Sequence, residues 1–299
     1  MAEHVSPAQD PGNLPIVAAV DGSEISHQAV AWAATEAELR HCPLHLITSY
    51  ALPVGRGTRT SLSAAEQAEL REGAERMLTE ATRIARKFIA DDIVITTELC
   101  LDPITPALID RSQHLRMVVV GNRGRRGISK AVAGSVSAAL SRHAHCPVAI
   151  VHGDAQGGPS AAQKQVVVGV DGTSNSLPAI ELAFEEAAQR RVGVRAVRAW
   201  SDSSGFDLPV VGWDRIRQTE ELLLDSELDE FSERFPEVPV ELVVVRDTPE
   251  RALLEHTADA QLLVVGSHGR GGFAGLVVGS VSIALLHLAE CPVIVVRQS

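Results

Sequence analysis

The chain has 299 residues, which is enough for two domains of ordinary size, each with its own hydrophobic core. Hydrophobic residues make up 45% of the composition and charged residues 22%, which is typical of globular rather than disordered proteins. The formal net charge of −11 argues against a general nucleic-acid binder, because such a protein needs excess cations to neutralise phosphates.

The first residues carry no signal for export. Residues 1–15 read MAEHVSPAQDPGNLP and lack both the basic and the apolar segment of a signal peptide. No apolar run approaches the roughly 18–20 residues of a membrane helix. We therefore expect a cytoplasmic protein without membrane insertion, in which residues 1–14 form a flexible tail.

Short β-branched runs then alternate with helical patterns. We expect strands first at 16–20, 44–50, 93–99, 117–120 and 148–151, and then at 166–170, 194–200, 240–245, 262–265 and 293–296. Helical patterns fill the intervals, for example at 26–40, 62–90 and 176–190. This alternation predicts an α/β fold with two tandem doubly wound domains, each a five-stranded parallel sheet of order 3-2-1-4-5 flanked by helices.

The two sets of strands belong to a tandem duplication. The segment VDGS at 20–23 returns as VDGT at 170–173, and CPV at 146–148 returns at 291–293. Copies of this length are domains rather than solenoid repeats. We place domain 1 at residues 15–151 and domain 2 at 166–297, joined by a Gly-, Ser- and Ala-rich linker at 152–165.

The cysteines suggest no chemistry. The chain has four of them, and their positions match neither C-x-x-C nor a zinc-ligand pattern: Cys42, Cys100, Cys146 and Cys291. We expect buried free thiols and predict no metal site.

One motif follows the fourth strand of each copy. Residues 121–135 read GNRGRRGISKAVAGS and residues 266–280 read GSHGRGGFAGLVVGS. Both contain G-x-x-G, nine residues and then G-S, where a new helical pattern starts. Glycines let a ligand approach the backbone, and a helix start offers free amide donors to an anion. A single copy would equally suit a turn and an N-cap serine; two copies with identical spacing favour a phosphate site.

The first strand of each copy ends in an aspartate, Asp21 or Asp171. Ligands of doubly wound sheets bind at the carboxyl ends of the strands, so these carboxylates could accept hydrogen bonds from a ribose or a base, or help to hold a metal. The alternative is an Asx-turn or N-cap aspartate that starts the next helix.

These motifs resemble the universal stress protein family, in its tandem two-domain form, over about residues 15–297. The specific part is the G-2x-G-9x-G-(S/T) signature, which in this family marks members that bind ATP. The resemblance implies ATP, with or without Mg²⁺, held by Gly121, Gly124, Gly134 and Ser135 in the first copy and by Gly266, Gly269, Gly279 and Ser280 in the second. It places Asp21 and Asp171 on the nucleoside side. Ala19 departs from the glycine that the family more often has there, and its methyl group is expected to crowd the nucleotide slightly.

Three functions compete on these features. The first is an ATP-binding regulator of the stress or dormancy response that acts through partner proteins. The second is a slow ATPase or autophosphorylating enzyme, and the third is a chaperone-like scaffold. Rapid catalysis needs a positioned base, but where one motif has His268 the other has Arg123. We therefore predict no catalytic residue and favour the regulator.

The last strand of each copy is short, apolar and at the edge of its sheet, at 148–151 and 293–296. An exposed edge invites pairing. In the resembled family these strands pair between protomers, so we expect the two halves to pair through them as an internal pseudo-dimer, and the whole protein to form a homodimer.

Overall fold

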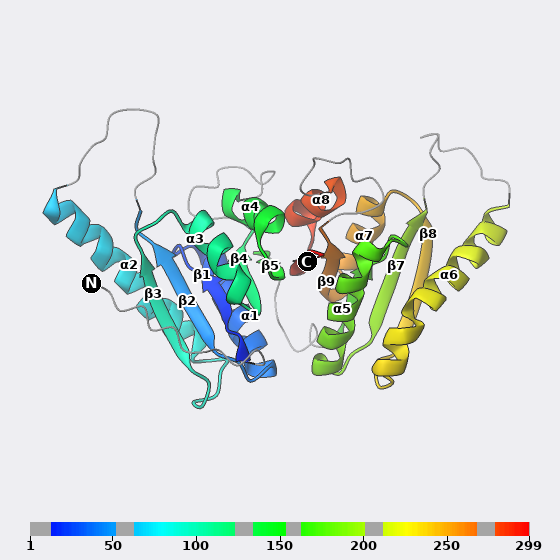
Figure 1. Cartoon of the computed structure of the whole chain (residues 1–299), viewed down its shortest axis with the longest axis horizontal. Helices are drawn as coiled ribbons and strands as arrows, with labels where there is room; N and C mark the ends of the chain where they lie inside the picture. Colours follow the sequence, from blue (N-terminus) through cyan, green and yellow to red (C-terminus); the bar gives the residue numbers. More distant parts are fainter. Residues whose placement is uncertain are drawn as a thin grey trace.

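One ten-stranded sheet runs through the whole molecule (Figure 1). The computed structural model describes residues 13–51, 63–122, 134–153, 163–200, 212–267 and 279–298. The strands are β1 (Ile16–Ala19), β2 (Leu44–Ser49), β3 (Ile95–Cys100), β4 (Met117–Gly121), β5 (Val148–Val151), β6 (Gln165–Gly169), β7 (Val194–Trp200), β8 (Val240–Arg246), β9 (Ala260–Gly266) and β10 (Val293–Val296).

Helices join consecutive strands within each half. They are α1 (Glu24–Leu39), α2 (Ala64–Ala85), α3 (Ile104–Arg111) and α4 (Ser135–His143), and then α5 (Leu177–Arg190), α6 (Trp213–Arg234), α7 (Pro249–Thr257) and α8 (Ser280–Leu288). Short 3-10 turns η2 (Ser112–His114) and η4 (Ser174–Ser176) complete the elements. Among the described residues, no helix is both long enough and apolar enough to cross a membrane.

The order of strands confirms the predicted topology. The sheet runs β3-β2-β1-β4-β5-β10-β9-β6-β7-β8, so each half has the order 3-2-1-4-5, and all pairs within a half are parallel. The first strand of each half therefore lies beside the fourth, at the switch point of the topology. This position is where doubly wound sheets bind ligands.

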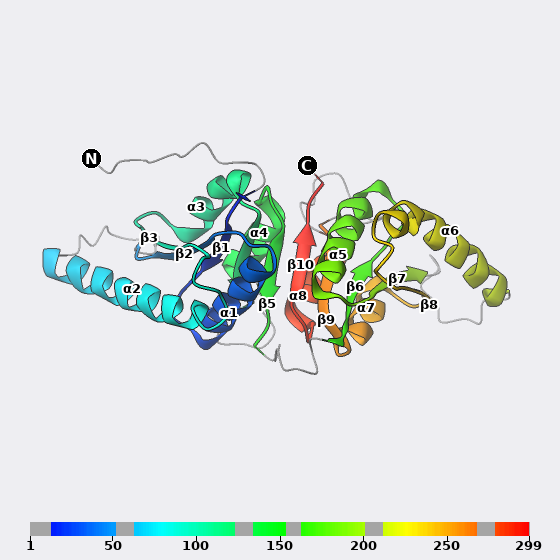
Figure 2. The ribbon, with the colours of Figure 1, turned by 90° about the horizontal axis from the view of Figure 1, so that it is seen from below.

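The two halves join through β5 and β10, as predicted. The pair is antiparallel, with Val293 opposite Ile150 and Val295 opposite Val148. Figure 2 shows the two strands side by side at the centre of the molecule. Every residue of β5 and β10 is buried, so each strand has neighbours on both sides and no exposed edge remains at the junction.

Two hydrophobic clusters cover the two faces of the sheet. One cluster packs α1, α2, α5 and α6 on the sheet, and the other packs α3, α4, α7 and α8 on the opposite face. Both clusters contain residues from both halves, including Val151 and Ile294 in the first and Ile150 and Val293 in the second. The hydrophobic core is therefore continuous across the duplication.

Charged residues also cross the junction, between α1 and α5. Arg40 donates to both Glu36 and Glu186, and Arg190 donates to both Glu186 and Glu36. We call these four residues the glutamate–arginine ring. The two glutamates are 1% and 0% exposed and the two arginines 5% and 9%, so the ring is a fully paired, buried cluster.

Candidate functional site

The strand register brings the two predicted motifs together in each half. Ile16 pairs with Met117 and Ala18 with Val119, and continuing this register three residues beyond Ala18 places Asp21 beside Asn122. In the second half, Val168 pairs with Val264, which places Asp171 beside Ser267 in the same way. Each aspartate thus lies next to the start of a glycine motif, at the carboxyl edge of the sheet.

The two ends of each glycine motif are held close together by backbone hydrogen bonds. Gly134 N–H donates to the Asn122 carbonyl at 2.9 Å, and Gly279 N–H donates to the Ser267 carbonyl at 3.0 Å. Asn122 itself is tied to the end of β5 by a bond to the Val151 carbonyl at 2.8 Å. The start of α4 or α8 therefore lies directly at the end of β4 or β9.

No side chain of the described residues caps the start of α4 or α8, as is also the case at α3, α5, α6 and α7. The N-cap residues of α4 and α8 are Gly134 and Gly279, whereas Ser23 and Ser63 cap α1 and α2 with their hydroxyl groups. The first amides of a helix have no partner within the helix, and the helix dipole makes this end positive. Both helices therefore offer amide donors to an anion at the carboxyl edge of the sheet.

In the second half the aspartate does two things at once. Asp171 Oδ1 accepts hydrogen bonds from Thr173 N–H at 2.9 Å, from the Thr173 hydroxyl at 2.8 Å and from the Ser176 hydroxyl at 3.0 Å. Its other oxygen, Oδ2, is buried and has no hydrogen-bond partner among the residues that the structure describes. A buried acceptor without a partner costs free energy. A ligand that donates a hydrogen bond to Oδ2 would remove this cost.

In the first half, Asp21 Oδ1 accepts from Ser23 N–H at 3.0 Å and from the Ser23 hydroxyl at 2.6 Å. The Asx-turn alternative is therefore part of the answer, because one carboxylate oxygen of each aspartate organises the start of the next helix. Gly22 and Gly172, which follow the aspartates, both have a φ of +76°, a left-handed conformation that glycine adopts without strain.

Two polar residues at the site did not stand out in the sequence. Asn122 is buried, and within the described part of the chain its Oδ1 atom has no hydrogen-bond partner. Ser176 adds the third hydrogen bond to Asp171. Both are ordinary loop or turn residues in the sequence, and only their position beside Gly121 or after Asp171 could have marked them.

Several predicted site residues lie outside the described part of the chain. These are Gly124 and Gly269, together with the motif residues Arg123, Arg125, Arg126, His268 and Arg270. Gly121, Gly134, Gly266 and Gly279 lie at the strand ends and helix starts described above, and Ser135 and Ser280 are the first residues of α4 and α8.

Ala19, which stands where the resembled family more often has glycine, contributes its methyl group to the packing of the hydrophobic core. Ala19 packs against the hydrophobic cluster beneath α3 and α4. A Cβ atom added to its counterpart Gly169 would lie 3.1 Å from Leu253 Cδ1 and 3.3 Å from Val265 Cγ1. The methyl group is thus directed at the helix-covered face, and its predicted effect on a nucleotide stays a prediction.

The cysteines are free and buried, as expected. Burial raises the pKa of Cys146 and of Cys291 to about 12, so these thiols remain protonated and unreactive at neutral pH. Within the described residues, no group of three or more histidine, cysteine or acidic side chains is arranged to hold a metal ion.

Comparison with known proteins agrees with these features. The model of the universal stress protein family matches residues 13–152 and again residues 163–297. The universal stress protein Rv2005c of Mycobacterium tuberculosis is 38% identical over 286 residues, covering 95% of this chain and 97% of its own. A crystal structure of a universal stress protein from Archaeoglobus fulgidus is similar in fold, with a TM-score of 0.65, 18% identity, and coverage of 95% and 98% of the two chains.

A universal stress protein solved in complex with cAMP matches 47% of this chain and 98% of its own, with 26% identity and a TM-score of 0.37. Two matched domains and a full-length relative of this identity are decisive. The chain belongs to the universal stress protein family and contains two of its domains in tandem.

Proposed function

We propose that each half of the chain binds one ATP and that the protein acts as a nucleotide-dependent regulator of the stress or dormancy response through partner proteins. The observation that carries the proposal is the pairing, in both halves, of an uncapped helix start with an aspartate on the neighbouring strand. Amide donors suit phosphate oxygens, and a carboxylate suits ribose hydroxyls or a base amine.

The described residues fit a nucleotide in a specific way. The amides at the start of α4 and α8 would receive phosphate, with Ser135 and Ser280 as the first helical residues. Asp171 Oδ2 and Asn122 Oδ1, both buried without a partner among the described residues, are acceptors that hydroxyl or amine groups of a nucleoside could satisfy. Any Mg²⁺ would be held mainly by the phosphates and water, which is how this ion usually binds.

We propose that ATP is held rather than turned over rapidly. The helix-start amides would hold the phosphates of ATP already in its ground state, and binding that is equal in the ground and transition states lowers no barrier. The aspartates, which could act as bases, already accept two or three hydrogen bonds each from the turn that follows them. Binding energy would instead alter the surface formed by the glycine motifs, and partner proteins would recognise the altered surface.

We further propose that the protein works as a homodimer in the cytoplasm. Four free, buried cysteines suit a reducing compartment. Slow hydrolysis or autophosphorylation is compatible with this proposal.

Mass spectrometry of nucleotide released from freshly purified protein is the direct test. We expect ATP, and calorimetry with nucleotide-free protein should give two sites per chain.

Gly124→Ala or Gly269→Ala, each of which adds a Cβ atom to the loop, should remove about one of the two sites, and the double variant should remove both. Gly73→Ala, at a half-buried position of α2 where a Cβ meets nothing closer than 3.8 Å, is the matched control and should bind normally.

Two results would contradict the proposal. Full binding by the double variant would place the nucleotide elsewhere. Multiple-turnover hydrolysis at about 1 s⁻¹ or faster, lost in the double variant, would favour an enzyme.

A further inference from the structure

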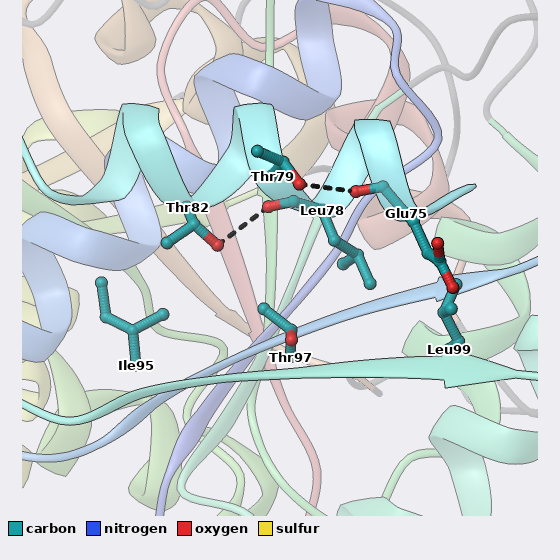
Figure 3. Close-up of a pocket in the computed structure, with 7 residues that line it drawn as sticks. All are labelled: Glu75, Leu78, Thr79, Thr82, Ile95, Thr97 and Leu99. Carbon is teal, nitrogen blue, oxygen red and sulfur yellow. Dashed lines mark hydrogen bonds between the residues drawn. The ribbon is translucent and has the colours of Figure 1, made fainter. Parts of the chain in front are cut away.

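Strand β3 is the outermost strand at one end of the sheet, with no further strand beside it among the described residues, and a groove of about 580 Å³ lies between it and α2. Figure 3 shows the residues that line the groove: Glu75, Leu78, Thr79 and Thr82 of α2, and Ile95, Thr97 and Leu99 of β3. The hydroxyls of Thr79 and Thr82 donate to carbonyls within α2, at 2.9 and 2.8 Å. The two threonine hydroxyls on the helix side of the groove therefore already donate hydrogen bonds within α2.

The corresponding strand position in the second half carries a larger side chain. Leu242 of β8 pairs with Ala196, as Thr97 of β3 pairs with Leu46, so Leu242 takes the place of Thr97. The buried positions of α2 and α6 match after a shift of 150 residues, which puts Phe231 where α2 has Ala81.

The backbone of β3 is open on its outer side. Leu44 N–H donates to the Val94 carbonyl at 3.0 Å, and Tyr50 N–H donates to the Cys100 carbonyl at 3.2 Å. In a parallel ladder the residues of a strand alternate between its two sides, so Ile95, Thr97 and Leu99 direct their N–H and C=O groups outward. Residues 94–101 (VITTELCL) contain neither proline nor lysine, the residues that commonly protect an edge.

The outward residues of β3 match those of a second, antiparallel copy of β3. If two copies of β3 pair antiparallel about Thr97, Thr97 faces Thr97 of the partner subunit, and Ile95 faces Leu99 of the partner subunit. All three outward residues then form hydrogen-bonded pairs, because their positions differ by two. On the other face, Thr96 faces Glu98 of the partner subunit. Apolar, threonine and hydroxyl–carboxylate pairs of these kinds stabilise neighbouring strands.

The charges near this edge are already paired within the chain. Glu98 is paired with Arg111 and with His45 Nε2, and Glu75 with Arg71 at 2.9 Å. A second copy would therefore meet no uncompensated like charge on the strand. Of the eight large apolar side chains exposed among the described residues, four surround β3 and α2: Leu70, Phe88, Val94 and Leu101.

The opposite edge of the sheet is less suited to a second copy. Helix α6, which packs on β8 as α2 packs on β3, has eight acidic and three basic residues, whereas α2 has five and three. Two copies of α6 brought together would repel each other.

We propose that the surface made of the outward backbone of β3 and the α2–β3 groove binds a second copy of the chain, by antiparallel pairing of β3 about Thr97. The existing junction of β5 and β10 already joins two half-sheets in this manner. The proposal specifies the interface of the proposed homodimer and does not depend on nucleotide.

Sedimentation velocity of the full chain over a concentration series tests the pairing. We expect a monomer–dimer equilibrium. Thr97→Lys places two like charges opposite each other at the twofold axis and should raise the dimer dissociation constant about tenfold or more. Thr96→Lys is the matched control: it adds the same charge to an exposed neighbour that faces a carboxylate of the partner subunit, and it should leave the dimer intact.

A cross-link gives an independent test. Opposite residues of a hydrogen-bonded antiparallel pair have Cα atoms about 5.5 Å apart, within the range of a disulfide. Thr97→Cys should therefore form an intersubunit disulfide on mild oxidation, whereas Thr96→Cys, whose copies lie diagonally, should not. The four native cysteines are buried and should not interfere.

Three results would overturn the proposal: a monomer at every concentration, a dimer that resists Thr97→Lys, or equal cross-linking of the two cysteine variants. Circular dichroism and nucleotide content of Thr97→Lys should match those of the parent. Because dimerisation and nucleotide content are measured separately, the interface proposal and the proposed function can fail independently of each other.

Discussion

At the scale of the residue, Asp171 divides its carboxylate between two tasks. One oxygen accepts three hydrogen bonds from Thr173 and Ser176 and so organises the turn into α5, while the other is buried without a partner in the part of the chain that the structure describes. The sequence could predict that an aspartate stands at the carboxyl end of the first strand. It could not predict which oxygen the turn would use, because that depends on the rotamer and on Ser176, five residues further along.

This division predicts different effects for two substitutions. Asp171→Asn keeps an Oδ1 acceptor for the turn but replaces the unpaired oxygen with an NH₂ group and removes the charge. We expect stability within about 1 kcal/mol of the parent and weaker nucleotide binding in the second half only. Asp171→Ala also removes the turn acceptor and should lower the free energy of unfolding by about 1–2 kcal/mol. Calorimetric titration and urea unfolding measure the two effects, and equal binding by Asp171→Asn and the parent would count against the assigned role.

At the scale of the element, the glutamate–arginine ring fastens α1 to α5. In the sequence, Glu36–Arg40 and Glu186–Arg190 look like surface pairs at i,i+4 on amphipathic helices. Their burial follows from the antiparallel junction of β5 and β10, which places two copies of the same helix face against each other. The strands were predictable because their apolar runs are local. The ring was not, because it depends on the contact between halves.

Breaking the ring should cost far more than breaking an exposed pair. Arg190→Ala leaves two buried carboxylates with one arginine and should lower the free energy of unfolding by about 3–5 kcal/mol. Arg71→Ala, which breaks an exposed i,i+4 pair on α2, should cost less than about 1 kcal/mol. Replacing all four ring residues by leucine or methionine should be nearly neutral. Denaturant unfolding of the three variants measures these differences, and a small effect of Arg190→Ala would show that the ring is hydrated.

The ring also predicts a dependence of stability on pH. Burial, with a further contribution from the Glu36 carboxylate, raises the pKa of Glu186 to about 7 from an ordinary value of 4.5. Because the folded state binds this proton more tightly, the contribution of Glu186 is fully present below pH 4.5 and is lost as the pH rises to about 7. Glu186→Gln should remove that fall. Stability measured from pH 5 to 8 for parent and variant tests this, and parallel curves would contradict it.

At the scale of the whole molecule, the duplication has produced one continuous sheet and core. The domain organisation and both half-sheets could be predicted from the repeat, and so could the pairing of the last strands. The sequence did not show that both core clusters would extend through the junction, because hydrophobic periodicity predicts single helices and strands and not the contacts between distant ones.

We therefore expect one cooperative thermal transition in calorimetry, with agreement between the calorimetric and van't Hoff enthalpies. Ile150→Pro should separate it into two transitions. The β4–β5 bonds use Pro147 and Val151, so the N–H of Ile150 faces β10 and proline removes this donor at the junction. Two transitions in the parent protein would show instead that the halves unfold independently.

The two outermost strands, β3 and β8, differ in sequence, and this difference affects how many chains can associate. A chain with two equally adhesive ends would add further chains at both, and pairing would continue into an open fibre. Here Thr97 stands on one end and Leu242 on the other, with Ala81 and Phe231 behind them. If only the β3 end adheres, association stops at two chains. Fusing two copies of a domain into one polypeptide allows this, since each end can then mutate without the other.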